Sequence, residues 1–180
     1  MRLRHRATAL LLTLGGVSFG TSEICRATNP ATITVTVTIQ SLSVSTTGPI
    51  AFGTVGAGSE TVSGSASTVT NDGNVTETFS LSLTDPAGWT AVQSAPGAEE
   101  YALLSMFNST APAANTFTYL DHALSTTPVA SSGTKFAGNE TGLSVPATET
   151  RSLWLRFNAP TSTTVTTEQS ITVTVTAAAG

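Results

Sequence analysis

The chain has very few of the residues on which covalent cross-linking and most catalytic chemistry depend. Among its 180 residues there is one cysteine, Cys25, and there are two histidines, His5 and His122. Cys25 and His5 lie in an N-terminal stretch that we expect to be removed on export. The remaining chain then has no thiol and only one imidazole. A fold stabilised by disulfides and a zinc site built from Cys and His are therefore excluded.

Positive charge is also scarce. After residue 27 the chain has only three cations, Lys135, Arg151 and Arg156, against ten carboxylates. An acidic surface of this kind repels phosphate groups, so nucleic acids and anionic membrane surfaces are unsuitable partners. No apolar run after residue 27 has the length that a membrane-spanning helix requires.

The N-terminus has the features of a secretory signal peptide. Three arginines in the first six residues precede a mostly apolar run over residues 7–19, which is too short to span a bilayer. Small residues allow cleavage after Gly20 or after Ala27, and we favour Ala27. The sequence therefore predicts an extracellular or cell-surface protein with a signal peptide at residues 1–27 and one domain at residues 28–180.

Alternating β-branched residues are the most informative feature that the chain does have. The hexapeptide Ile-Thr-Val-Thr-Val-Thr occurs at residues 33–38 and again at residues 171–176. Each copy predicts a strand with one buried face and one wet face. Neither copy contains a charge, Pro or Gly, so the two strands are able to pair within one molecule or with copies in neighbouring molecules. The predicted assembly residues are Ile33, Val35, Val37, Ile171, Val173 and Val175.

Other segments predict an all-β domain. Residues 75–84 and 149–157 alternate between apolar and polar side chains, whereas residues 101–107 are apolar on both parities and fit a doubly buried strand or a short helix. Turn-bounded segments number about eight or nine, as in an immunoglobulin-like or jelly-roll-like β-sandwich. The pattern loosens over about 108–146, which we interpret as an irregular inserted region.

Two motifs resemble those of known sandwich families. The run Ile-Ala-Phe-Gly-Thr-Val-Gly-Ala-Gly at residues 50–58, followed by Val-Thr-Asn-Asp-Gly-Asn at residues 69–74, resembles the opening of immunoglobulin-like domains of the abnormal-spindle, SPD-2 and hydin type. Similar signatures occur in secreted bacterial and archaeal fibre subunits of the TasA and camelysin type. Both resemblances imply a sandwich, and the second implies a subunit that polymerises by donating a strand. Residues 71–74 themselves predict a tight hairpin turn.

Groups able to perform catalysis or hold a metal are few. His122 follows Asp121, and neighbours on an extended chain point to opposite faces, so Asp121 is badly placed to orient the imidazole. We therefore predict no catalytic residue, no cofactor and no enzymatic activity. Calcium is the one metal with suitable ligands, because Asp72, Asn74 and Asp85 carry hard oxygen atoms in predicted turns. Tight turns also select these residue types for their own geometry.

Two tryptophans suggest a different kind of site. If Leu153 and Leu155 face the core, Trp154 faces outward beside Arg156. Together with Trp89 it would then form a possible ligand platform for sugar rings, although a tryptophan covered by the inserted region is an equally natural structure.

The sequence thus supports two functions of different classes. The first is a non-catalytic secreted structural protein, a cell-surface or filament subunit that assembles with copies of itself or with other surface proteins through its terminal strands. The alternative is an extracellular carbohydrate-binding or adhesion module whose ligands are glycans.

Overall fold

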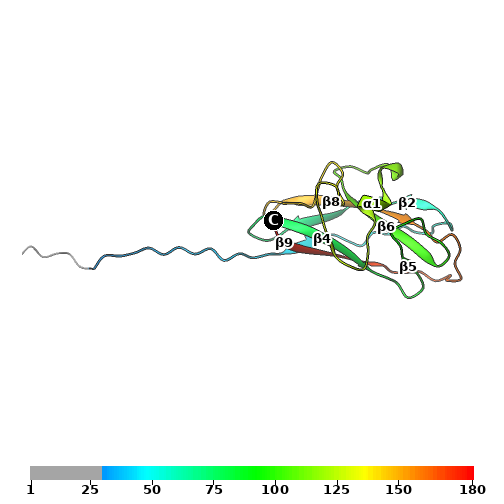
Figure 1. Cartoon of the computed structure of the whole chain (residues 1–180), viewed down its shortest axis with the longest axis horizontal. Coiled ribbons are helices and arrows are strands. Elements are labelled where there is room, and N and C mark those ends of the chain that lie inside the picture. The colour runs from blue at the N-terminus through cyan, green and yellow to red at the C-terminus, as the bar shows by residue number, and fades with distance from the viewer. Residues whose placement is uncertain (1–29) are drawn as a thin grey trace, which may run out of the picture. The chain divides into compact units, whose positions relative to one another are not determined.

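The computed structural model describes residues 30–180. The chain divides into two units, with the boundary between residues 37 and 38. Within the described residues the second unit contains all nine strands, arranged as two sheets with very little helix (Figure 1). The predicted all-β sandwich is therefore confirmed.

The larger sheet has six strands, in the order β1-β3-β8-β6-β5, and β2 also pairs with β8. Its pairings are antiparallel except for the parallel pairing of β5 with β6. Its strands are β1 (Val44–Thr46), β2 (Glu60–Val62), β3 (Ser67–Asn71), β5 (Thr90–Ala91), β6 (Glu100–Phe107) and β8 (Thr150–Asn158).

The smaller sheet consists of β7 (Val129–Ala130), β4 (Glu77–Thr84) and β9 (Thr172–Ala179), in the order β7-β4-β9. β4 and β9 are antiparallel and paired over their whole length, from Glu77 opposite Ala179 to Thr84 opposite Thr172. β9 contains residues 172–176 of the second alternating hexapeptide, so the strand predicted at residues 171–176 is confirmed apart from its first residue.

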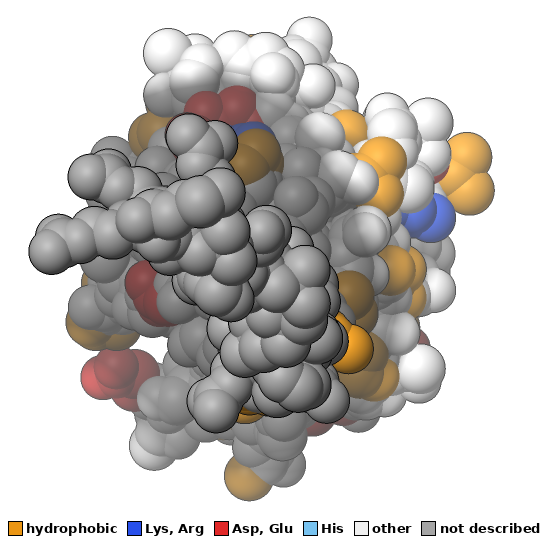
Figure 2. Space-filling view, turned by 90° about the vertical axis from the view of Figure 1, so that its left-hand side faces the viewer, with side chains coloured by type: hydrophobic (Ala, Val, Ile, Leu, Met, Phe, Trp, Pro, Cys, Tyr) orange, Lys and Arg blue, Asp and Glu red, His pale blue; other side chains and the backbone are white. Residues whose placement is uncertain are grey.

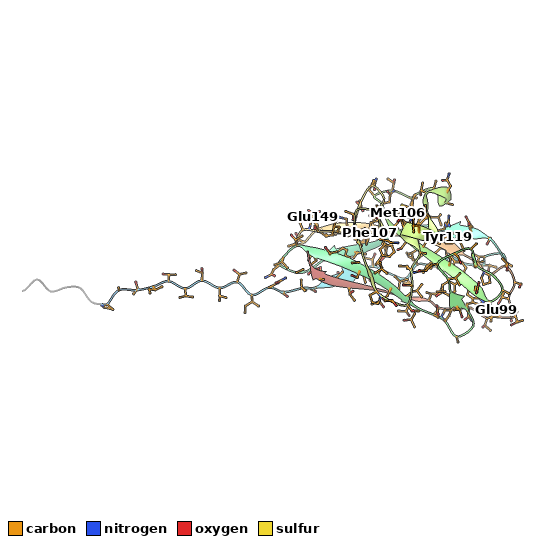
Figure 3. The ribbon with its side chains drawn as sticks, viewed as in Figure 1. Glu99, Met106, Phe107, Tyr119 and Glu149 are labelled. Carbon is orange, nitrogen blue, oxygen red and sulfur yellow. The ribbon has the colours of Figure 1, made fainter. Side chains whose placement is uncertain are left out.

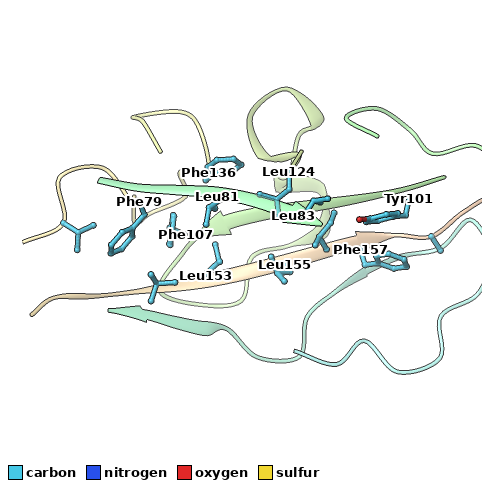
Figure 4. Close-up of a cluster of buried hydrophobic side chains, with 14 residues drawn as sticks. Phe79, Leu81, Leu83, Tyr101, Phe107, Leu124, Phe136, Leu153, Leu155 and Phe157 are labelled. Atoms are coloured by element: carbon cyan, nitrogen blue, oxygen red, sulfur yellow. The ribbon is translucent and has the colours of Figure 1, made fainter. Parts of the chain in front are cut away.

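The main core lies between the two sheets (Figure 4). The apolar side chains at alternate positions of β4 and β8 point into this core, as the alternation in their sequences predicts. β6 is a strand buried on both faces, which settles the choice that the sequence left open. Its consecutive residues Met106 and Phe107 (Figure 3) belong to two different clusters, because Phe107 joins the main core and Met106 joins a second cluster. The labelled core residues are Phe79, Leu81, Leu83, Tyr101, Phe107, Leu124, Phe136, Leu153, Leu155 and Phe157.

The inserted region, residues 108–146, is irregular but well packed. It contains a 3-10 turn, η1 (Ala114–Thr116), and one short helix, α1 (Tyr119–His122), in addition to β7. Phe117 and Ala123 pack in the second cluster, against the β6 side chains that face away from the main core. Leu124, Phe136 and Val145 are buried in the main core, although no periodicity in the sequence marks them as core residues.

Two local predictions are wrong. The structure assigns no strand to residues 30–43, and the first strand begins at Val44. A strand is defined by hydrogen bonds to a neighbouring strand, and every strand pairing within residues 30–180 is made among β1–β9. Residues 71–74 do not form a hairpin either, because they lead from β3 in the larger sheet to β4 in the smaller one.

Candidate assembly site

Residues 33–38, which we call the arm, carry large apolar side chains that are exposed to solvent. Within the first unit Ile33, Val35 and Val37 are 89%, 84% and 85% exposed. β-branched aliphatic side chains are normally buried in a folded protein, and single exposed ones are unremarkable. An unbroken row of them on one parity is different, because it forms a contiguous apolar stripe.

Residues 39–43, near the start of the second unit, form a short segment that is hydrogen-bonded to the turn before β4. The side-chain amide of Asn74 donates to the Ile39 carbonyl at 2.8 Å, and its Oδ1 accepts from the Ser41 N–H at 2.8 Å. The Ser43 N–H donates to Oε1 of Glu77 at 2.8 Å. We call residues 39–43 the root, because these bonds hold the chain directly after the arm.

Glu77 is the most deeply buried member of this arrangement. Its residue exposure is 0%, and its Oε2 has no hydrogen-bond partner among the described residues. Gly73 lies against it, and a Cβ at Gly73 would collide with the Glu77 carboxylate and the Ser41 carbonyl. Glycine is therefore required here by close packing. The sequence carries no signal for this role, since a glutamate at the start of a strand ordinarily faces water.

The predicted C-terminal assembly residues lie at one edge of the smaller sheet. β9 is one of the two edge strands of this sheet, and Ile171, Val173 and Val175 pack against the main core while remaining partly exposed. The partner residues on β4 are much better covered, since Leu81 opposite Val175 is 0% exposed and Leu83 opposite Val173 is 3% exposed. The core is thus less completely closed along β9 than along β4.

The structure does not bring the three calcium candidates together. Asp72 and Asn74 are exposed in the turn before β4, whereas Asp85 follows the opposite end of that strand. Asp85 is already engaged, because its Oδ1 accepts from the Ala91 N–H and from the Tyr101 hydroxyl. Within residues 30–180 no group of three or more Asp, Glu, His or Cys side chains is arranged to hold a metal ion.

The contact between Tyr101 and Asp85 changes the pKa of the tyrosine hydroxyl. Burial, followed by the 2.9 Å hydrogen bond to Asp85, raises the pKa of the Tyr101 hydroxyl well above its usual value. The folded protein therefore keeps this proton at a pH where the unfolded chain loses it. Stability conferred by this difference is complete below about pH 10 and declines as the pH rises further.

We expect Tyr101→Phe to flatten the alkaline loss of stability. In the parent protein the free energy of unfolding should fall by up to about 1 kcal/mol per pH unit above pH 10 from this group. Urea titrations at pH 8 and pH 11 measure the difference, with Tyr119→Phe as a control that keeps the Tyr101–Asp85 bond. Equal alkaline losses in the parent and Tyr101→Phe would contradict the assignment.

His122 and Asp121 do not form a catalytic pair. The imidazole is 6% exposed at the end of α1, where Nδ1 accepts from the Thr118 N–H at 2.9 Å and Nε2 lies 3.3 Å from the Ala137 carbonyl. Asp121 is instead contacted by the Thr118 hydroxyl at 3.4 Å. Both imidazole nitrogens are thus engaged by the backbone in a buried, structural position.

The two tryptophans lie in different clusters. Trp89 packs beside the main core, with ring centroids 5.9 Å from Phe157, and its Nε1–H donates to the Thr163 hydroxyl. Trp154 packs against the second cluster, and its Nε1–H donates to the Asn108 carbonyl at 2.8 Å. Because the two clusters occupy opposite faces of the sheet, the indole rings do not form one common platform.

Arg156 is buried, contrary to the expectation that it faces solvent beside Trp154. It is 4% exposed, and its guanidinium lies over the rings of Phe117 and Tyr119 at 5.7 and 5.8 Å. One guanidinium nitrogen lies 3.5 Å from the Glu60 carboxylate. The inserted region covers this side chain, which sequence alternation alone does not reveal.

No family model, curated protein or solved structure matches the chain. Over residues 30–180, none of the helices is both long enough and apolar enough to cross a membrane. On the described part of the face in Figure 2, uncharged polar groups and backbone, drawn white, predominate over charged side chains. Among the described residues, the exposed apolar row of the arm and the unpaired edge of β9 are the features that indicate a function.

Proposed function

We propose that the protein is a non-catalytic, secreted structural subunit that assembles with copies of itself through its terminal β-segments. The observation that carries this proposal is the solvent exposure of the arm, whose Ile33, Val35 and Val37 are each more than 80% exposed. A stripe of this kind is typical of a surface that another protein covers.

Burying the apolar side chains of the arm against a partner is more favourable in free energy than leaving them in water. Full burial of a Val or Ile side chain contributes about 1.5–3 kcal/mol. No residue from positions 30–43 belongs to the main core of the second unit. The arm's potential stabilisation is therefore available for contacts with a second molecule.

The rest of the molecule supports a structural role. The one buried imidazole is held by backbone groups, and no cluster of acids accompanies it within the described residues. The resemblance of the glycine and asparagine motifs to fibre subunits of the TasA and camelysin type supports the same proposal. The carbohydrate-binding alternative has less support, because both indole N–H groups are engaged internally and the two rings are on opposite faces of a sheet.

Deleting residues 30–38 tests the proposal. We expect the exported parent protein to form oligomers or filaments at high concentration, and the deletion variant to be a folded monomer. Because residues 44–180 supply all the strands and core residues found within residues 30–180, the free energy of unfolding of the isolated domain should change by less than about 1 kcal/mol.

Light scattering after size exclusion and negative-stain electron microscopy give the assembly state of both proteins. A parent protein that stays monomeric at high concentration would contradict the proposed function. Assembly that persists unchanged after the deletion would show that surfaces other than the arm cause it.

A further inference from the structure

We propose that the free edge of β9 is the acceptor for the arm of a second copy, and that the two segments run antiparallel with Val35 opposite Val175. This inference rests on the proposed function and adds the edge, the direction and the register of pairing.

β9 is the one long edge strand among the described strands. It has eight residues, whereas the other strands with only one paired neighbour, β1, β2, β5 and β7, have three, three, two and two. Natural sheets protect their edges with short strands, charged side chains, Pro or bulges. β9 contains no charge and no Pro, and its eight-residue pairing with β4 is continuous. Such an edge is suited to accept another strand.

The backbone groups on this edge point outward at defined residues. The Gly180 N–H donates to the Thr76 carbonyl, directly beyond the pairing of Ala179 with Glu77. In an antiparallel pair the bonded positions alternate, so the even-numbered residues of β9 bond to β4. The N–H and C=O groups of Val173, Val175 and Ala177 therefore face the free edge. Within residues 30–180, β9 pairs with β4 alone.

The side chains on the same residues are incompletely covered. Val173, Val175 and Ala177 contact the main core but are only partly buried. An added strand would cover them if its own apolar residues faced the core. The arm satisfies this condition when its odd-numbered residues lie opposite the odd-numbered residues of β9. A shift by one residue would turn the arm's threonines toward the core, so the pattern excludes it.

The position of the root sets the direction. The Ser43 N–H is bonded to Glu77, and Glu77 is paired with Ala179, so the root lies at the end of the domain where β9 terminates. In a head-to-tail stack of copies, an arm leaving this end reaches the opposite end of the next domain, where β9 begins at Thr172. It then runs against β9, in the antiparallel sense. An arm folded back on its own β9 would run parallel to it.

The register follows from maximal overlap of the two alternating segments. Val35 opposite Val175 places Val37 opposite Val173 and Ile33 opposite Ala177. The intervening threonines then face one another at the positions without backbone bonds, where side chains approach most closely. Cross-strand threonine pairs of this kind are favourable. Because donor and acceptor are different surfaces, the contact repeats without closing and generates a filament.

Paired cysteines test the direction and the register. In a precursor with Cys25→Ser, which leaves the exported chain without a native thiol whichever cleavage site is used, we combine Thr172→Cys with Thr38→Cys in one variant and with Thr34→Cys in another. All three threonines lie on the outward parity, so neither variant removes an apolar contact. Antiparallel pairing places residue 38 opposite residue 172 and residue 34 four positions away. Non-reducing electrophoresis after mild oxidation should show a ladder of linked chains for the 38/172 variant and at least tenfold less linkage for the 34/172 variant.

The other outcomes separate this inference from the proposed function. A linkage within single chains that is stronger for 34/172 would show the arm folded back on its own β9. Filaments that form without linkage in the 38/172 variant would overturn the proposed edge or register and leave the structural function standing. A protein that neither assembles nor links would overturn both.

Discussion

A carboxylate at position 35 will lower the association constant between copies by at least 100-fold. Val35→Asp places a charge on the arm parity that we expect to be covered by the next subunit, and burying an unpaired charge costs several kcal/mol. The midpoint of thermal unfolding of the domain should stay within about 2 °C of the parent value, because Val35 is 84% exposed and lies outside the main core. Light scattering over a concentration series measures the association constant.

Thr36→Asp is the matched control. It adds the same charge one residue away, on the parity that stays in water, so we expect less than a tenfold change in association. Equal effects of the two substitutions would mean that net charge repulsion, rather than burial of one face of the arm, controls assembly.

Removing the aromatic ring of Phe157 will lower the free energy of unfolding by about 3–5 kcal/mol, the range for truncating a buried aromatic residue. Phe157 is 4% exposed in β8, and its ring lies 5.6 Å from that of Phe52 and 5.9 Å from that of Tyr101. Phe157→Ala therefore leaves a cavity among aromatic rings contributed by several segments. Urea unfolding followed by tryptophan fluorescence measures the loss, since Trp89 packs on the same ring.

Phe157→Leu serves as the control for this prediction. It retains much of the buried volume, so its loss should be smaller, about 1–2 kcal/mol. A loss below 1 kcal/mol for Phe157→Ala would show that this end of the core is not packed as described. Assembly should be unaffected by Phe157→Leu, because Phe157 is buried on β8 of the larger sheet, whereas the proposed contact is made by the edge of β9 in the smaller sheet.

The fold class was predictable because the strands that build the core have a clean period of two. β4 and β8 show this alternation, and their apolar parities face each other across the sandwich. The inserted region has no such period, so Leu124, Phe136 and Val145 were not recognisable as core residues. The burial of Arg156 was equally hidden, since it depends on Phe117 and Tyr119 arriving from a distant part of the chain.

The candidate site was predictable only in part. Alternation correctly identified β9 as a strand, whereas the arm has the same pattern and is not a strand in the structure. Alternation also does not specify which strand is at an edge, because sheet order depends on long-range pairing. The turn at residues 71–74 shows the same limit. Its Asn and Gly residues predicted a local hairpin, whereas Asn74 binds backbone groups of Ile39 and Ser41, more than thirty residues earlier in the chain.

Hydrogen exchange at the β9 edge tests the central claim most directly. The account predicts that the amides of Val173, Val175 and Ala177 become protected in the parent protein as its concentration rises, while the same amides exchange quickly at every concentration once residues 30–38 are deleted. Identical exchange at these three amides in the two proteins would contradict it.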